Sequence, residues 1–105
     1  EVNCSGESQK YGVPVGAVEC LIDQLVTLPN IELRGLMTMA PRVERAEDAR
    51  PVFVRLREIF EDIVSSRRGG AQFRDLSMGM SQDFEVAIEE GATLVRVGAA
   101  IFANA

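Results

Sequence analysis

Two stretches near the carboxyl end of the chain combine apolar runs with small residues and a hydroxyl, a pattern that suits anion binding. One runs from Leu76 to Ser81 and the other from Leu94 to Ala99. Each predicts a strand that enters a tight turn and then a helix, which leaves backbone N–H groups free at the turn. Two such turns side by side form a site for an anion, usually a phosphate.

Each residue at these turns allows a functional and a structural interpretation. Ser81 stands at the expected N-cap of the following helix, so its hydroxyl either binds an anion or only caps the helix. Asp83 then places a carboxylate in the first helical turn. Gly98 and Ala99 either offer backbone N–H groups to the same anion or simply end the last strand.

Charged candidates are few in the same region. Arg96 is the only charged residue within the apolar stretch 92–103. Its guanidinium either faces the mouth of a barrel or forms a buried ion pair with Glu85 or Glu89. Lys10 is the only lysine, so amine chemistry must use Lys10 or the N-terminal amine. Because Lys10 lies in a loop rich in Gly and Ser, an ordinary exposed side chain is the structural alternative.

The composition excludes several classes of function. The 105 residues suffice for one small domain, and the net charge of −5 argues against a nucleic-acid surface. With no histidine, Ser–His–Asp and Cys–His nucleophiles are absent, and the spacing of Cys4 and Cys20 matches no zinc motif. We expect these thiols to be buried in a reducing cytoplasm. No apolar run approaches the roughly 18 residues of a membrane span, no signal peptide is apparent, and Glu89-Glu90 should be a solvated surface.

The hydrophobic periodicity alternates between strand-like and helix-like segments along the whole chain. This order predicts an α/β fold with parallel strands and right-handed crossovers, and the apolar strand 31–39 favours a sheet covered on both faces. Four β/α units are half of an eightfold (β/α) TIM barrel, here a single partial domain over residues 1–105. A small open sheet is the alternative, although the apolar last strand would be prone to aggregate as an edge. The predicted strands are 1–4, 31–39, 73–78 and 93–98, and the predicted helices are 14–28, 46–67 and 82–90, before a short apolar segment at 100–102.

Four stretches together resemble one known family. Residues 76–84, Leu-Ser-Met-Gly-Met-Ser-Gln-Asp-Phe, resemble the L-S-M-G-M-S-x-D-F signature of the YggS/PROSC family of pyridoxal 5′-phosphate (PLP) homeostasis proteins. Residues 33–39 are similar to the family's R-G-L-M-T strand, and residues 3–12 to its N-x-S-G-E-x-x-K-x-G loop. Residues 95–102 are similar to its V-R-I-G-T-x-I-F ending. The family shares its fold with the N-terminal domain of alanine racemase.

The resemblance implies that the chain is the carboxyl-terminal half of such a protein and contributes barrel strands five to eight. In the family a lysine on the first strand forms the Schiff base with the cofactor, and that strand is absent here. Lys10 matches a lysine of a later loop, which could hold a phosphate or transiently accept the aldehyde. By resemblance the whole protein binds and delivers PLP and does not turn over a substrate.

The resemblance also implies roles for individual residues. Ser81 would bind the cofactor phosphate, together with the N–H groups of Gly98 and Ala99, where the family usually has Thr in place of Ala99. Arg96 would face the pyridine nitrogen and leave it unprotonated, which disfavours carbanion chemistry. Met80 is a further candidate contact for the cofactor, although methionines at strand positions mainly fill cores.

Two other functions stay open. The chain could be half of an alanine-racemase-like PLP enzyme, a racemase or decarboxylase, although Tyr11 is its only tyrosine and no histidine is available as a base. It could also be a half-barrel whose role is self-assembly, or pairing with a missing amino-terminal half. The edges of the first and last predicted strands motivate this last interpretation.

Overall fold

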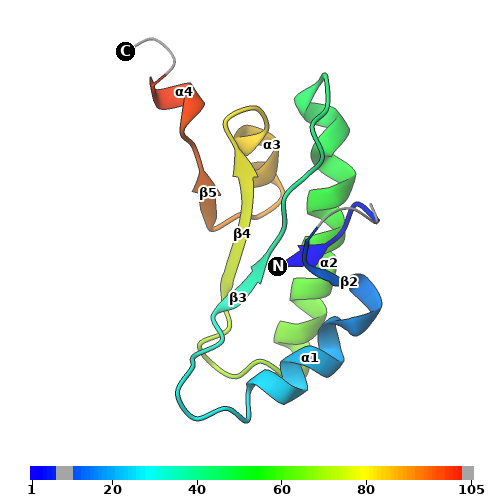
Figure 1. The fold of residues 1–105 in the computed structure, drawn as a ribbon, viewed down its shortest axis with the longest axis vertical. Helices are drawn as coiled ribbons and strands as arrows, with labels where there is room; N and C mark the ends of the chain where they lie inside the picture. Colours follow the sequence, from blue (N-terminus) through cyan, green and yellow to red (C-terminus); the bar gives the residue numbers. More distant parts are fainter. Residues whose placement is uncertain (7–10, 103–105) are drawn as a thin grey trace.

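The computed structural model describes residues 1–6 and 11–102, and it confirms the alternation of strands and helices (Figure 1). Within these ranges no helix is both long and apolar enough to cross a membrane. The elements in chain order are β1 (Val2–Asn3), β2 (Val13–Pro14), the 3₁₀ turn η1 (Val15–Ala17), α1 (Val18–Leu25), β3 (Gly35–Met37), the 3₁₀ turn η2 (Ala46–Ala49), α2 (Arg50–Ser66), β4 (Asp75–Met80), α3 (Phe84–Glu89), β5 (Leu94–Arg96) and α4 (Ala99–Phe102).

Strands β3, β4 and β5 form a parallel sheet in that order. Leu36 of β3 pairs with Leu76 of β4, and Met80 at the end of β4 pairs with Arg96 at the end of β5. The register shifts between Ser77 and Met80, which is a local irregularity of β4. Since all three strands are parallel, their carboxyl ends lie at one edge of the sheet, where the predicted anion site belongs.

The first strand does not join this sheet, contrary to the predicted four-unit pattern. β1 instead pairs in parallel with β2, a strand that the sequence did not predict. Pro14 has the extended backbone of β2 (φ −64°, ψ 152°), so the expected helix 14–28 begins only after it, first as η1 and then as α1. Its end also comes early: after Leu25 the backbone forms tighter turns, in which the Thr27 N–H donates to the Gln24 carbonyl (3.2 Å) and the Leu28 N–H to the Leu25 carbonyl (3.1 Å). The Thr38 hydroxyl, just after β3, donates to the Val2 carbonyl (2.8 Å) and joins β1 to the larger sheet.

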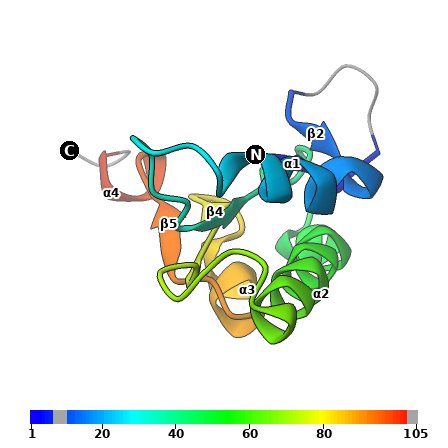
Figure 2. The same ribbon diagram turned by 90° about the horizontal axis from the view of Figure 1, so that it is seen from below.

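Helices α2 and α3 pack together against one face of the β3-β4-β5 sheet (Figure 2). The largest fully buried side chains come from α2 and β4 and meet at this contact: Phe53, Leu56, Ile63, Leu76 and Met78. The other face carries half-buried Met37 and Ser77, and Leu94 is 53% exposed. Within the described residues, the expected covering helices α2 and α3 therefore lie on one face of this sheet. Apolar residues on both faces are typical of a parallel sheet whose two faces are both buried.

Helix α2, with η2 before it, matches the predicted helix 46–67 closely, and it ends in an unusual backbone conformation. The residue that takes the left-handed conformation after the helix is Arg67 (φ 56°, ψ 21°), not a glycine. The N–H of Arg68 then donates to the Ile63 carbonyl (3.3 Å), which closes the last turn. A side chain in this conformation is strained, so the position is one where glycine would be favoured.

Candidate functional site

The turn between β4 and α3 is held by a buried carboxylate. Asp83 is only 3% exposed, and its carboxylate accepts the Met80 N–H (2.7 Å) while its own N–H donates to the Met80 carbonyl (3.1 Å). Gly79 precedes this turn with φ +108°, and a Cβ there would lie 2.8 Å from the Ala87 Cβ. Both observations show that the turn has one tight conformation, from which the Ser81 side chain projects.

Ser81 is not the N-cap of the following helix. Helix α3 begins at Phe84 and its N-cap is Asp83, which makes no side-chain capping bond. The Asp83 carboxylate points back to Met80 instead of lying within the first turn, as the sequence had suggested. The alternative that Ser81 only caps the following helix is therefore wrong, and its hydroxyl has a different partner.

That partner is the start of α4, 17 residues further along the chain. The Ser81 Oγ accepts the N–H of Gly98 (3.2 Å) and the N–H of Ala100 (3.0 Å). Ala99 lies between these two amides and is exposed. The structure thus brings Ser81, Gly98 and Ala99 together, at the neighbouring carboxyl ends of β4 and β5. A hydroxyl and two backbone N–H groups converge on one small region, a donor set suited to an oxyanion.

Arg96 and Met80 lie beside this region, one on each of two paired strands. Met80 is half-buried and Arg96 is exposed. Arg96 forms no ion pair with any residue in the described part of the chain, and Glu89 is paired with Arg50 (2.6 Å). The alternative of a buried ion pair between Arg96 and Glu85 or Glu89 is therefore wrong. Its guanidinium is available at the same edge of the sheet as Ser81.

Lys10, the remaining predicted site residue, lies outside the described residues. The strand end before its loop is ordered by Asn3, whose side-chain oxygen accepts the Ser5 hydroxyl (3.1 Å) and the Gly6 N–H (3.1 Å). Gly12, after the loop, has φ +98°. Because Lys10 lies outside the described residues, its role stays a prediction from the sequence.

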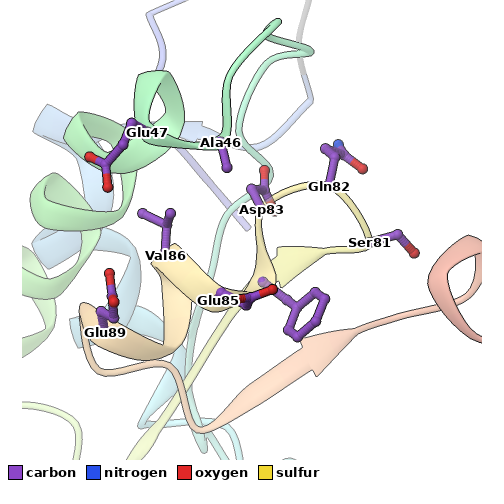
Figure 3. A pocket seen from close by; sticks show the side chains of 9 residues that line it. Ala46, Glu47, Ser81, Gln82, Asp83, Glu85, Val86 and Glu89 are labelled. Carbon is purple, nitrogen blue, oxygen red and sulfur yellow. The ribbon is translucent and has the colours of Figure 1, made fainter.

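A hollow of about 330 Å³ lies on the other side of Ser81, between η2 and α3 (Figure 3). Its acidic lining would repel an anion, and in Figure 3 the Ser81 side chain points away from Glu47 and Glu89, toward α4. Neither Gly98 nor Ala99 lines this hollow. The candidate anion site is therefore the α4 side of Ser81 and not this hollow. The hollow is lined by Ala46, Glu47, Ser81, Gln82, Asp83, Phe84, Glu85, Val86 and Glu89.

An ion-pair network that no local sequence pattern indicated joins the end of α3 to α2. Glu90, expected at a solvated surface, has a side chain only 12% exposed and contacts Arg50 (2.6 Å) and Arg57 (2.5 Å). Arg50 also pairs with Glu47 (2.6 Å), and these hydrogen bonds raise the pKa of Arg50 and lower the pKa of Glu47. Only the Glu47–Arg50 spacing of three residues could have been recognised in the sequence.

The two cysteines do not share the expected buried environment. Cys4 is half-buried, and burial raises the pKa of its thiol against a smaller opposing effect of the Thr38 hydrogen bond. Cys20 lies on α1 and is exposed. The expectation of two buried thiols is therefore wrong for Cys20.

The chain is similar over its whole length to known proteins. The family model for the alanine racemase N-terminal domain matches residues 1–105. The pyridoxal phosphate homeostasis protein of Aquifex aeolicus (strain VF5) is 47% identical over 102 residues, which are 97% of this chain and 44% of that protein. The chain thus spans less than half the length of the curated relatives that it matches.

Solved structures give the same result for the fold. An unknown protein from Bifidobacterium adolescentis superposes with a TM-score of 0.88 and 43% identity, over 96% of this chain and 40% of that chain. PipY of Synechococcus elongatus PCC7942, in a structure with PLP bound, superposes with a TM-score of 0.75 and 32% identity, over 90% of this chain and 44% of that chain.

Proposed function

Because the chain belongs to the family of alanine racemase N-terminal domains, we propose that it is the part of a PLP homeostasis protein that holds the phosphate end of the cofactor. In this proposal the chain is half of a (β/α) barrel and contributes strands five to eight. Its role is to bind PLP as a carrier, as the names of its relatives suggest, and not to turn over a substrate. The observation that carries the proposal is the convergence of Ser81 with the Gly98 and Ala100 amides.

The donor set fits a phosphate monoester. The hydroxyl of Ser81 now accepts both N–H groups, but it can rotate to donate to a phosphate oxygen, which frees the Gly98 and Ala100 amides to donate to the same group. Loops after the seventh and eighth strands are the usual phosphate site of (β/α) barrels. Ala99 supplies no side-chain donor, so we expect phosphate affinity to depend on the backbone amides and on Ser81.

In this proposal Arg96 and Met80 meet the ring end of the cofactor. They are register neighbours on β4 and β5, with Met80 one residue before Ser81 and Arg96 two residues before Gly98. Bound PLP would supply an electron-withdrawing ring and a reactive aldehyde. Arg96 keeps its own proton, so beside the pyridine nitrogen it would leave that nitrogen unprotonated and reduce the electron-withdrawing power of the ring. This arrangement favours carriage over catalysis, with Lys10 as the only lysine side chain.

The test is a calorimetric titration of the 105-residue chain with PLP, with pyridoxal and with inorganic phosphate. We expect PLP to bind weakly, inorganic phosphate to compete with it, and pyridoxal, which lacks the phosphate, to give no measurable binding. Equal affinities for pyridoxal and PLP would overturn the proposal, because the phosphate group would then contribute nothing.

A further inference from the structure

We propose that Asp83 is a positioning residue for the phosphate site: its buried carboxylate holds the turn after β4 in the conformation that presents the Ser81 hydroxyl to the start of α4. This inference rests on the proposed function, and it adds a determinant of phosphate affinity that does not itself contact the phosphate. Asp83 acts on the anion only through Ser81, which lies two residues before it in the chain.

Asp83 closes the turn by two hydrogen bonds to the same residue. Its carboxylate accepts the Met80 N–H (2.7 Å), and its own N–H donates to the Met80 carbonyl (3.1 Å). A hydrogen bond to a charged acceptor is roughly twice as strong as one between neutral groups. Because Asp83 is only 3% exposed, water competes little for its carboxylate. Ser81 lies between the two bonded residues, so the backbone that carries its side chain is fixed at both ends.

The end of β4 contains one more residue than the part of β5 that it faces. Between Ser77 and Met80 the register shifts by one residue, since three steps along β4 face two along β5. An extra residue of this kind is a β-bulge, which bends the strand and changes the direction of the side chains beyond it. The bulge includes Gly79, whose φ of +108° is unfavourable for any residue with a side chain. The Met80 N–H that Asp83 accepts comes directly after this glycine.

The bulge and the Asp83 contact together set the position of the Ser81 hydroxyl. The side chains of Asp83 and Ser81 leave the turn in different directions (Figure 3). The Ser81 oxygen accepts the N–H groups of Gly98 (3.2 Å) and Ala100 (3.0 Å), but both bonds are exposed and contribute little to the stability of the turn. Since a donor that is already in place loses less conformational entropy on binding, a turn fixed by Asp83 binds phosphate more tightly than a mobile one.

The charge of Asp83 does not account for its place beside an anion site, because like charges repel. Its acidic neighbours Glu47 and Glu89 are both paired with Arg50 (2.6 Å each), whereas Asp83 forms no ion pair within residues 1–6 and 11–102. The contribution of Asp83 is therefore the position of its oxygen atom and not its charge. Asparagine has a carbonyl oxygen at the same place, so it should replace Asp83 without loss of phosphate affinity.

The test is calorimetric titration of the 105-residue chain and its variants with inorganic phosphate and with PLP. Asp83→Ala should weaken binding roughly fivefold, the loss expected from removing the Ser81 hydroxyl itself. Asp83→Asn should bind within about twofold of the original chain or more tightly, because it keeps the acceptor. Asp83→Glu keeps the charge but displaces the oxygens by one methylene, so it should bind as weakly as Asp83→Ala. Glu85→Ala, which removes an exposed carboxylate from the first turn of α3, is the matched control and should leave both affinities unchanged.

A double-variant cycle separates positioning from a general effect on folding. If Asp83 acts through Ser81, Asp83→Ala adds nothing to Ser81→Ala, and the double variant also binds roughly fivefold more weakly. Independent effects would multiply to about 25-fold. Urea unfolding of each variant measures stability separately. Ile63→Val, a buried change near the carboxyl end of α2, should lower stability and leave the phosphate affinity unchanged.

Undiminished affinity in Asp83→Ala would overturn the inference, as would an Asp83→Asn chain that binds as weakly as Asp83→Ala, or a double variant that multiplies the two losses. If Asp83→Ala does not fold, the asparagine and glutamate variants decide in the same way.

The amide signals of the ligand-free ¹⁵N-labelled chain give a reading that does not depend on phosphate. Asp83→Ala and Ser81→Ala should shift the Gly98 and Ala100 signals alike, because both variants remove the hydroxyl oxygen from these amides. Signals that stay in place in Asp83→Ala would overturn the inference. The expected shift in a chain that binds no phosphate would contradict the proposed function alone.

Discussion

Replacing Ser81 by alanine tests how the proposed phosphate site works before and after binding. In the free protein the hydroxyl oxygen accepts two N–H groups, from Gly98 at 3.2 Å and from Ala100 at 3.0 Å. In the proposed site, binding a phosphate would break both of these bonds, because the amides and the hydroxyl would all turn to the anion. Ser81→Ala removes one hydrogen-bond donor to the anion. It also removes the hydroxyl oxygen that competes with the anion for the Gly98 and Ala100 N–H groups.

The two effects oppose each other and can be compared in size. A hydrogen bond to a charged group contributes roughly 1.5–3 kcal/mol, whereas a bond between neutral groups contributes roughly 0.5–1.5 kcal/mol. The two bonds that the Ser81 oxygen accepts are exposed. Since Ser81→Ala has no such bonds to break on binding, it regains part of the phosphate affinity that it loses with the hydroxyl. We expect Ser81→Ala to weaken binding by about 1 kcal/mol, which is roughly a fivefold increase in Kd.

The assay is calorimetric titration with PLP and with inorganic phosphate, next to urea unfolding of each variant. Ser65→Ala, an exposed serine on α2, is the control and should leave both ligands unaffected. Ser81→Thr keeps the hydroxyl and should retain the affinity that Ser81→Ala loses. An unchanged Kd in Ser81→Ala would contradict the expected net loss of about 1 kcal/mol. A loss beyond about a hundredfold would refute the internal competition, because no freed amide would then offset the lost donor.

Three further predictions concern stability and reactivity. The hydrogen bonds from Arg50 hold the pKa of Glu47 below its usual 4.5, so the contribution of Glu47 is present above pH 4.5 and is lost as the pH falls through the lowered value. Urea unfolding between pH 6 and pH 2.5 should therefore show a flatter acid limb for Glu47→Gln, and an unchanged limb would contradict this. Arg67→Gly should stabilise the chain by about 0.5–1 kcal/mol, because it relieves the left-handed φ of 56°, and a loss of stability in urea would refute it. Alkylation at pH 7.5 followed by peptide mapping should label exposed Cys20 before Cys4, whose thiol has a raised pKa, and the reverse order would contradict the burial of Cys4.

Local pattern was sufficient to predict much of the fold. The long apolar stripe of α2 and the strand-turn-helix order around Ser81 depend on residues close in sequence, and both are present in the structure. The approach of Ser81 to Gly98 also followed, because adjacent parallel strands end at the same edge of a sheet. These are consequences of periodicity and of the rules for connecting strands.

The features that escaped prediction depend on contacts between distant residues. Glu90 is 40 residues from Arg50 and 33 from Arg57, and no local pattern shows that its carboxylate is enclosed between them. The pairing of β1 with β2 was missed because Pro14 suits a helix start and an extended strand equally well, and its strand form depends on the bond from the Val13 N–H to the Glu1 carbonyl. The Asp83 contact is the exception, because Met80 lies only three residues away. Asp83 was expected in the first helical turn, but its carboxylate accepts the Met80 N–H instead.

The central claim is that the amides at the start of α4 bind a phosphate. Titration of the ¹⁵N-labelled chain with inorganic phosphate, followed by PLP, measures this directly through the amide signals. We predict that the signals of Gly98 and Ala100 shift most with both ligands, while that of Gly91 at the far end of α3 stays in place. Gly98 and Ala100 signals that remain unmoved at saturating PLP would contradict the account.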